Sequence, residues 1–159
     1  MKFFTIGVFN STEQEFFSKL SENRIDTFCD IRQRRGVRGS KYAFVNSNRL
    51  QEKLSGLGIQ YTYVDGLAPT PEIRQVQTQI DAEKHESKTQ RTQLDKTFTA
   101  AYKKGILNKF DFKSFFESLN RMGSQRIVLF CVEETANACH RSLVAEKLHH
   151  DFHFAVTHL

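Results

Sequence analysis

Short apolar runs alternate along the chain with segments in which apolar residues recur at helical spacing. Short runs that are rich in β-branched and aromatic residues and bounded by polar turns are typical of buried strands. The pattern therefore predicts strands over residues 3–9, 25–31, 59–64, 126–132 and 154–159.

Helical segments fall between these runs, and several of them have clear start and stop signals. Ser11 to Gln14 form a predicted capping box, and Asn46 and Thr70 are predicted N-caps. Gly58 and Gly123 are predicted to end two of the helices. The residues that we expect on the inner faces of the helices are Phe16, Phe17, Leu20, Leu50, Leu54, Leu57, Phe98, Ala101, Tyr102, Phe112, Phe115, Phe116 and Leu119.

Helices that alternate with apolar strands predict an α/β fold. Strands that are almost continuously apolar are typical of a parallel sheet covered by helices on both faces. We therefore expect a three-layer, Rossmann-like architecture around a mostly parallel sheet of about five strands. A chain of 159 residues, 39% of them hydrophobic, suits one core of ordinary size, so residues 1–159 are predicted to form a single domain.

One segment interrupts the regular alternation of strands and helices. Between Gln75 and Lys96 the apolar residues become sparse, while charged residues and glutamine become more frequent. The segment at about 70–105 is therefore predicted to be a polar helical insert, and its stretch from Gln75 to Lys96 is too polar to belong to the core. It either covers a functional site or forms an arm on the surface.

The sequence favours a cytoplasmic protein without a membrane partner. No apolar run of about 18 residues is present, and Met1 leads directly into a strand without the features of a signal peptide. The three cysteines are odd in number and do not resemble the disulfide framework of a secreted domain.

The net charge of +5 is less informative than the distribution of the basic residues. Arg32, Arg34, Arg35, Arg38 and Lys41 lie within ten residues directly after the second predicted strand, with two glycines between them. Guanidinium groups hold phosphate in a bidentate fork, and glycine lets the backbone approach a ligand closely. The segment is therefore predicted to bind anions, with a solvated basic loop as the alternative.

Polar side chains follow each of the predicted strands. Asn10 follows the first strand, Asp30 and Arg32 lie at the end of the second, Asp65 ends the third, Glu133 follows the fourth, and His158 lies near the end of the fifth. The carboxyl ends of parallel strands meet at one edge of the sheet, where open α/β folds bind their ligands. The sequence therefore predicts a functional site at this edge.

The most reactive set of residues lies after the fourth predicted strand. Cys131 and Glu133 follow the strand, and Cys139, His140 and Arg141 lie at the predicted start of the next helix. A helix start and a nearby guanidinium favour a thiolate, and a carboxylate beyond a strand suits proton transfer. Each group also has a structural interpretation, since a buried thiol can serve packing alone and a carboxylate can pair with an arginine.

These patterns give each candidate residue a predicted role. The predicted catalytic residues are Glu133, Cys139 and Asp30. The predicted substrate-binding residues are Asn10, Arg32, Arg35, Cys131, His140, Arg141 and Ser142. In this hypothesis the arginines hold phosphate, a carboxylate moves a proton or positions water, and Cys139 is an optional nucleophile.

Residue spacing argues against several familiar chemistries. A zinc ion would need Cys29, Cys131, Cys139 and His140, but adjacent residues rarely reach one tetrahedral ion well and no C-x-x-C pair is present. We therefore expect no metal and no cofactor. The cysteine-to-arginine spacing of tyrosine phosphatases and rhodaneses is absent, and so are a P-loop, a G-x-G-x-x-G fingerprint and a serine nucleophile elbow.

The same residues carry a resemblance to a known family. The segments Cys131–Glu133 and Cys139–Ala145 are similar to the signature of the domain of unknown function 488 family, a group of small prokaryotic proteins. Thr5-Ile6-Gly7 with Asn10, and Asp30-Ile31-Arg32, add to the resemblance, but the Cys-His-Arg-Ser element is its specific part. The resemblance implies a fold and a site but no reaction.

Two main function classes follow from this evidence. The first is an enzyme that acts on a phosphate-bearing substrate, with a nucleotide or nucleic acid preferred. The second is a non-catalytic nucleic-acid-binding module in which the basic loop follows the backbone and Tyr42 or Phe44 stacks on bases. Carboxylates and thiols have no use in the second class, so the first is favoured. Thiol-dependent sulfur or redox transfer through Cys131 and Cys139 is a further alternative.

Overall fold

A computed structural model describes residues 1–87 and 90–159, so two residues of the predicted insert lie outside the described part. The described strands form one sheet in the order β3-β2-β4-β1-β5, and all neighbouring strands are parallel. The α/β class and the parallel sheet of five strands are therefore confirmed. The strands are β1 (Lys2–Ile6), β2 (Thr27–Asp30), β3 (Gln60–Tyr63), β4 (Arg126–Phe130) and β5 (Val156–His158).

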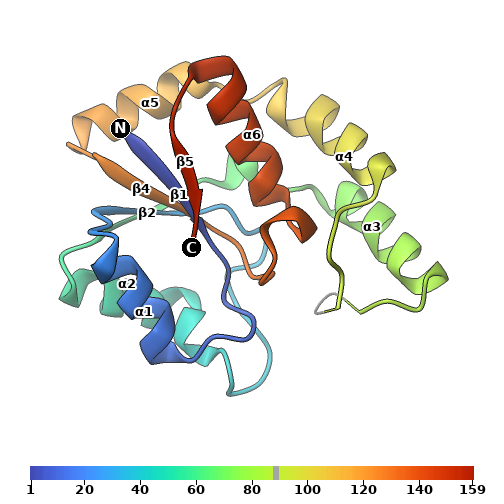
Figure 1. The fold of residues 1–159 in the computed structure, drawn as a ribbon, viewed down its shortest axis with the longest axis horizontal. Coiled ribbons are helices and arrows are strands. Elements are labelled where there is room, and N and C mark those ends of the chain that lie inside the picture. The colour runs from blue at the N-terminus through green and yellow to red at the C-terminus, as the bar shows by residue number, and fades with distance from the viewer. Residues whose placement is uncertain (88–89) are drawn as a thin grey trace.

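Helices cover both faces of the sheet, which confirms the three-layer prediction (Figure 1). The helices are α1 (Glu13–Glu22), α2 (Ser47–Gly56), α3 (Pro71–Glu83), α4 (Lys96–Tyr102), α5 (Phe112–Arg121) and α6 (His140–Phe152), with 3-10 turns at 43–45, 65–67 and 136–138 and a π-helical stretch at 103–107. Alternate strand residues point to opposite faces. Phe28 packs in the core under α1 and α2, and the next residue, Cys29, packs in the core under α4, α5 and α6.

The strands are shorter than the apolar runs that predict them. β1 ends at Ile6 rather than at Phe9, because the backbone N–H groups of Val8 and Phe9 both donate to the carbonyl of Val132 in the loop after β4. Residues 25–26 likewise lie outside β2, and β5 covers only the centre of the predicted run 154–159. Apolar residues beyond the strand ends are therefore buried in the core although their backbones do not continue the hydrogen bonds of the sheet.

Two helix ends differ from their predictions. The capping box lies one residue later than predicted, because Thr12 caps the Glu15 N–H and the Glu15 carboxylate accepts from the Thr12 N–H. Asn46 precedes α2 as predicted, but its side chain accepts a hydrogen bond from the Val37 N–H instead of from the helix. Leu57 was expected on the inner face of α2 but lies beyond the helix, and 42% of its surface is exposed.

The order of the strands creates a switch point between β2 and β4. These strands are neighbours, but α2, which follows β2, covers one face, and α6, which follows β4, covers the other. Such switch points are where open α/β sheets bind ligands. The order differs from the 3-2-1-4-5-6 order of the common dinucleotide-binding fold because β4 lies between β1 and β2.

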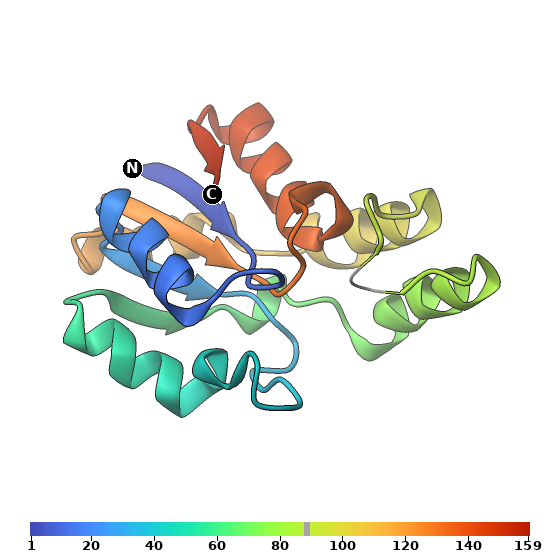
Figure 2. The ribbon, with the colours of Figure 1, turned by 60° about the horizontal axis from the view of Figure 1, so that its bottom comes forward.

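The predicted insert lies beyond the carboxyl ends of the strands. In Figure 2 the arrows of β1, β2 and β4 point toward the side on which α3 and α4 lie. α3 begins after the Thr70 N-cap with Pro71 at its first position, as the sequence predicts. No helix in the described ranges has both the length and the apolar character needed to cross a membrane.

Candidate functional site

A cleft of about 690 Å³ lies outside the carboxyl ends of β2 and β4. Three segments supply most of its lining: the basic loop after β2, the loop and helix start after β4, and the insert. Phe9 adds a contact from the loop after β1. The insert therefore contributes to the site, which agrees with one of the two alternatives for this segment. Among the predicted site residues, Arg32, Cys131, Glu133 and His140 line the cleft.

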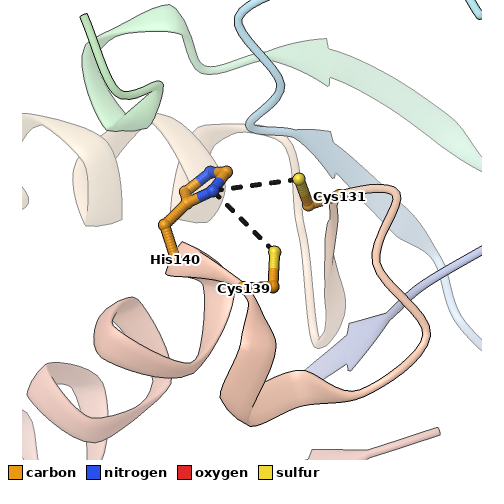
Figure 3. A group of neighbouring side chains, drawn as sticks. All are labelled: Cys131, Cys139 and His140. Carbon is orange, nitrogen blue, oxygen red and sulfur yellow. Dashed lines mark hydrogen bonds between the residues drawn. The ribbon is translucent and has the colours of Figure 1, made fainter. Parts of the chain in front are cut away.

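Two thiols and an imidazole converge at one side of this cleft. The Nδ1 atom of His140 lies 3.8 Å from the Sγ atom of Cys131 and 3.8 Å from that of Cys139. Figure 3 shows Cys131 reaching toward the imidazole from the loop after β4, while Cys139 and His140 come from the start of α6. The Cys131 Sγ atom also lies 3.2 Å from the Glu133 Oε2 atom. Segments on either side of a polar loop thus form one cluster.

A change of backbone conformation brings adjacent side chains together. Cys139 is the N-cap of α6 and has extended backbone angles, with φ at −137° and ψ at 143°, whereas His140 is the first helical residue. In a continuous helix or strand, consecutive side chains point in different directions. At the cap the direction changes, so the side chains of Cys139 and His140 can both face Cys131.

Burial and charge act in opposite directions on the Cys139–His140 pair. Burial raises the pKa of the Cys139 thiol, but the hydrogen bond with Cys131 and the positive charges of His140 and Arg141 bring this pKa well below its usual value. Burial lowers the pKa of His140, and the negative charges of Cys139 and Glu133 raise it above its usual value. The pair therefore favours a thiolate next to an imidazolium.

Asp30 and Arg32 form a buried ion pair directly behind the cleft. The Arg32 guanidinium donates to both carboxylate oxygens of Asp30, at 2.9 and 2.7 Å, and lies over the ring of Phe130 at 4.5 Å. The Tyr61 hydroxyl donates to the same carboxylate at 2.9 Å. Asp30 is fully buried and Arg32 is 2% exposed. Asp30 therefore orients an arginine of the cleft rather than facing the cleft itself.

Arg91 lines the cleft, although the sequence predicts only that it is one of several cations that add to the basic side of the molecule. This arginine of the insert is buried, pairs with Asp81 at 2.6 Å and Glu133 at 3.4 Å, and donates to the carbonyl of Ala138 at 2.8 Å. The only signal was one cation in a polar segment, which is equally typical of a solvated surface. Arg91 is buried in spite of the polar character of its segment, because its charge is compensated locally, and it belongs to neither hydrophobic core cluster.

Arg141 stabilises the loop after β4 through hydrogen bonds to its backbone. Its guanidinium donates to the carbonyls of Glu133 and Glu134, and only 1% of the residue is exposed. Gly7 lies against the same loop, where an added Cβ atom would be 1.9 Å from the Glu133 carbonyl oxygen and 3.1 Å from the Arg141 guanidinium. The described contacts of Arg141 thus go to protein carbonyls, and it is outside the cleft lining.

Three other predicted substrate-binding residues lie outside the cleft lining. Asn10 lines a separate hollow and its amide donates to the Glu134 carboxylate. Arg35 lies over the ring of Tyr63 at 4.4 Å, outside the cleft lining. Ser142 is buried and its hydroxyl donates to a carbonyl of its own helix turn. Their roles in binding a substrate remain predictions.

The comparison with protein families agrees with the motif after β4. No curated protein matches the chain, and no solved structure matches it. A family model described as "Domain of unknown function DUF488" matches residues 12–148, which include every segment that lines the cleft except Phe9. The match covers most of the 159 residues and includes the Cys-His-Arg-Ser element. The chain therefore belongs to the DUF488 family of domains of unknown function.

Proposed function

We propose that the cleft is the active site of an enzyme that acts on a phosphate-bearing small molecule. The observation that carries this proposal is the Nη1 atom of Arg32. This nitrogen is buried, has no hydrogen-bond partner among the described residues, and belongs to a side chain that lines the cleft. A buried, unsatisfied guanidinium donor is costly, and an anionic ligand oxygen would satisfy it.

The charge at the cleft supports an anionic ligand. Arg34, Arg38 and Arg74 also line the cleft, and none of them forms an ion pair within residues 1–87 and 90–159. The acidic residues of the lining are Asp81 and Glu133, which both pair with Arg91, and Glu86, against five arginines of the same lining. The uncompensated charge of the lining is therefore mainly positive, which suits the charge of a phosphate group.

The size and the aromatic lining favour a nucleotide over inorganic phosphate. A volume of about 690 Å³ lies within the usual range of small-molecule sites. Phe9 and Tyr42 line the cleft with ring centroids 5.3 Å apart. Aromatic rings of this kind stack on nucleobases. The arginines would hold the phosphates, and these rings would contact the base.

Glu133 is the group that we assign to proton transfer. Its carboxylate lines the cleft, is held by Arg91 at 3.4 Å, and lies next to Cys131. A general base must reach the proton that it accepts, and a fixed carboxylate beside the anion-binding surface meets this condition. Glu133→Gln should abolish turnover of an identified substrate and leave its binding within about threefold, since the amide retains the shape of the side chain.

Calorimetric titration with adenosine monophosphate, pyrophosphate and inorganic phosphate tests the proposed ligand class. We expect saturable binding that weakens in Arg34→Ala/Arg38→Ala by at least about tenfold, because two ligand contacts to charged groups are lost. Arg49→Ala is the matched control, since Arg49 is an exposed arginine of α2 that pairs with Glu13 outside the cleft. No binding of any probe, or equal loss in both variants, would overturn the proposal.

The nucleic-acid-binding alternative has one observation in its favour. Arg34, Arg35, Arg38 and Lys41 are exposed on one continuous loop, where a polyanion could follow them. An oligonucleotide held in this way should bind much more tightly than a mononucleotide, with a steep dependence on salt that Arg34→Ala/Arg35→Ala reduces. Binding of the mononucleotide alone would support the small-molecule cleft.

A further inference from the structure

We infer that Cys131, Cys139 and His140 form a binding site for a borderline-soft divalent transition metal ion, with zinc as the best match. The two Sγ atoms and the His140 Nδ1 atom all lie within 4.8 Å of one another. They point toward a common centre (Figure 3). The inference is independent of the phosphate-bearing ligand proposed for the cleft.

The distances between the candidate ligand atoms suit a tetrahedral ion. Zinc binds sulfur at about 2.3 Å and nitrogen at about 2.0–2.1 Å, so tetrahedral angles place a sulfur and a nitrogen ligand about 3.6 Å apart. The two distances from the His140 Nδ1 atom to sulfur are both 3.8 Å. The two nitrogen–sulfur distances would therefore shorten by only about 0.2 Å on binding. The two sulfurs lie within 4.8 Å of each other, and a tetrahedral ion would hold them about 3.8 Å apart.

The tautomer of His140 is set for coordination through Nδ1. The Nε2 atom lies 3.0 Å from the carbonyl oxygen of Ile31, and a carbonyl can only accept a hydrogen bond. Nε2 therefore carries a proton, and the lone pair of Nδ1 in the neutral ring faces the two sulfurs. Metal-binding histidines commonly donate their second N–H to a carbonyl or carboxylate in this way. The ring of Tyr102 packs against the imidazole at 5.4 Å and restricts its rotation.

The three ligands also indicate which class of metal ion would bind and where its fourth coordination position would lie. Two thiolates and an imidazole favour zinc and related ions over magnesium or calcium, which prefer oxygen ligands. Cys131 and His140 line the cleft, whereas Cys139 is buried behind them. The fourth position would therefore face the cleft and accept water or an oxygen of a bound molecule, as in catalytic sites with two cysteines and one histidine. Binding would release the proton of the Cys131 thiol and the single proton of the Cys139–His140 pair to solvent, which leaves two thiolates and a neutral imidazole on the ion.

Titration of the reduced, chelator-treated full chain with Co²⁺ tests this site. We expect a single bound ion with a sulfur-to-cobalt charge-transfer band that Zn²⁺ removes. Cys131→Ser, Cys139→Ser and His140→Gln should each weaken the affinity by at least about 100-fold, because loss of a mere supporting residue already costs about 10–100-fold. Cys29→Ala is the matched control, since Cys29 is a buried thiol in β2 outside this cluster, and it should bind with unchanged affinity.

A second measurement uses the unaltered protein and does not depend on the folding of the variants. Zn²⁺ should protect Cys131 and Cys139 from iodoacetamide in peptide mapping by mass spectrometry, and the Arg34→Ala/Arg38→Ala variant should show the same protection. Three results would overturn the inference: cobalt binding without a thiolate band, single-ligand variants with unchanged affinity, or alkylation that Zn²⁺ does not slow. A Cys131–Cys139 disulfide in a protein without metal affinity would instead support redox chemistry.

Discussion

At the scale of single residues, the site depends on a few positions that tolerate little change. Gly7 is one of them, because the loop after β4 passes where a side chain would begin. Asp30 is another, because it holds Arg32 in a buried ion pair. Neither residue carries chemistry of its own in the proposed enzyme, yet each fixes the position of a group that does.

Gly7→Ala should destabilise the protein by about 3 kcal/mol, since an added Cβ atom would lie 1.9 Å from the backbone oxygen of Glu133 and the loop would have to move. Gly56→Ala is the matched control. Gly56 ends α2, an added Cβ atom meets nothing within 4 Å, and the substitution should leave stability unchanged or raise it by up to about 1 kcal/mol. Chemical unfolding of both variants checks the difference, and equal stabilities would contradict the close approach.

Asp30→Asn should cost about 3 kcal/mol or more, because it leaves the charge of Arg32 buried without a counter-charge. Glu13→Gln removes one partner of the exposed Glu13–Arg49 pair and should cost less than about 1 kcal/mol. Urea unfolding compares the two variants. Both lose one negative charge, so the difference in their free energies of unfolding reports the effect of burial. A small loss for Asp30→Asn would show that water reaches Arg32.

At the scale of elements, the insert is attached to the sheet edge through Arg91. This side chain joins α3, through Asp81, to the loop after β4, through Glu133 and Ala138. Arg91→Met should therefore raise amide hydrogen exchange in α3 by at least about tenfold, since hydrogen bonds to charged groups contribute about 1.5–3 kcal/mol.

Lys84→Met is the control for the attachment of the insert. Lys84 forms an exposed pair with Asp95 at 3.6 Å, so its loss should change exchange in α3 very little. Exchange measured by mass spectrometry distinguishes the two variants. Equal exchange in Arg91→Met and in the unaltered protein would mean that packing alone holds the insert against the site.

His158 in the edge strand β5 should make the free energy of unfolding depend on pH. Burial, and then the charge of Arg141, lower the pKa of His158, whose Nδ1 atom lies 2.7 Å from the Thr5 hydroxyl. A group with a lowered pKa contributes stability that is present above its unfolded pKa of about 6.5 and is lost as the pH falls through the folded pKa.

His158→Gln should therefore lose less stability than the unaltered protein when the pH falls from about 7 to 5. The difference should be small, because His158 is partly exposed. His150→Gln, at an exposed position of α6, should keep the slope of the unaltered protein. Thermal unfolding at a series of pH values provides the test, and a steeper slope in His158→Gln would reverse the assigned sign.

At the scale of the whole molecule, three distant segments of the chain form most of one cleft, and Phe9 completes its lining from the loop after β1. The loop after β2, the insert and the start of α6 meet because β2 and β4 are neighbours at the centre of the sheet. The positive lining, the aromatic rings and the thiol–imidazole cluster come from different segments. The proposed ligand and the inferred metal site both depend on this convergence.

The sequence by itself determined the local elements and the family. Apolar runs and helical spacing located the five strands and the main helices, because these patterns reflect burial on one or both faces of a regular element. The ends of the elements were less accurate, as β1 and the helix cap at Thr12 show, since they depend on hydrogen bonds to other segments. The Cys-His-Arg-Ser element identified the family without any knowledge of its contacts.

Only the tertiary structure decided which of the polar residues meet. It placed Cys131 against His140, turned adjacent Cys139 and His140 toward one centre, and buried Arg91 between the insert and the sheet. The tertiary structure also places the Arg141 guanidinium against two backbone carbonyls of the loop after β4. Such contacts join residues that are distant in sequence or depend on a change of backbone direction at a helix cap. Periodicity describes the faces of single elements, so it contains no information about these contacts.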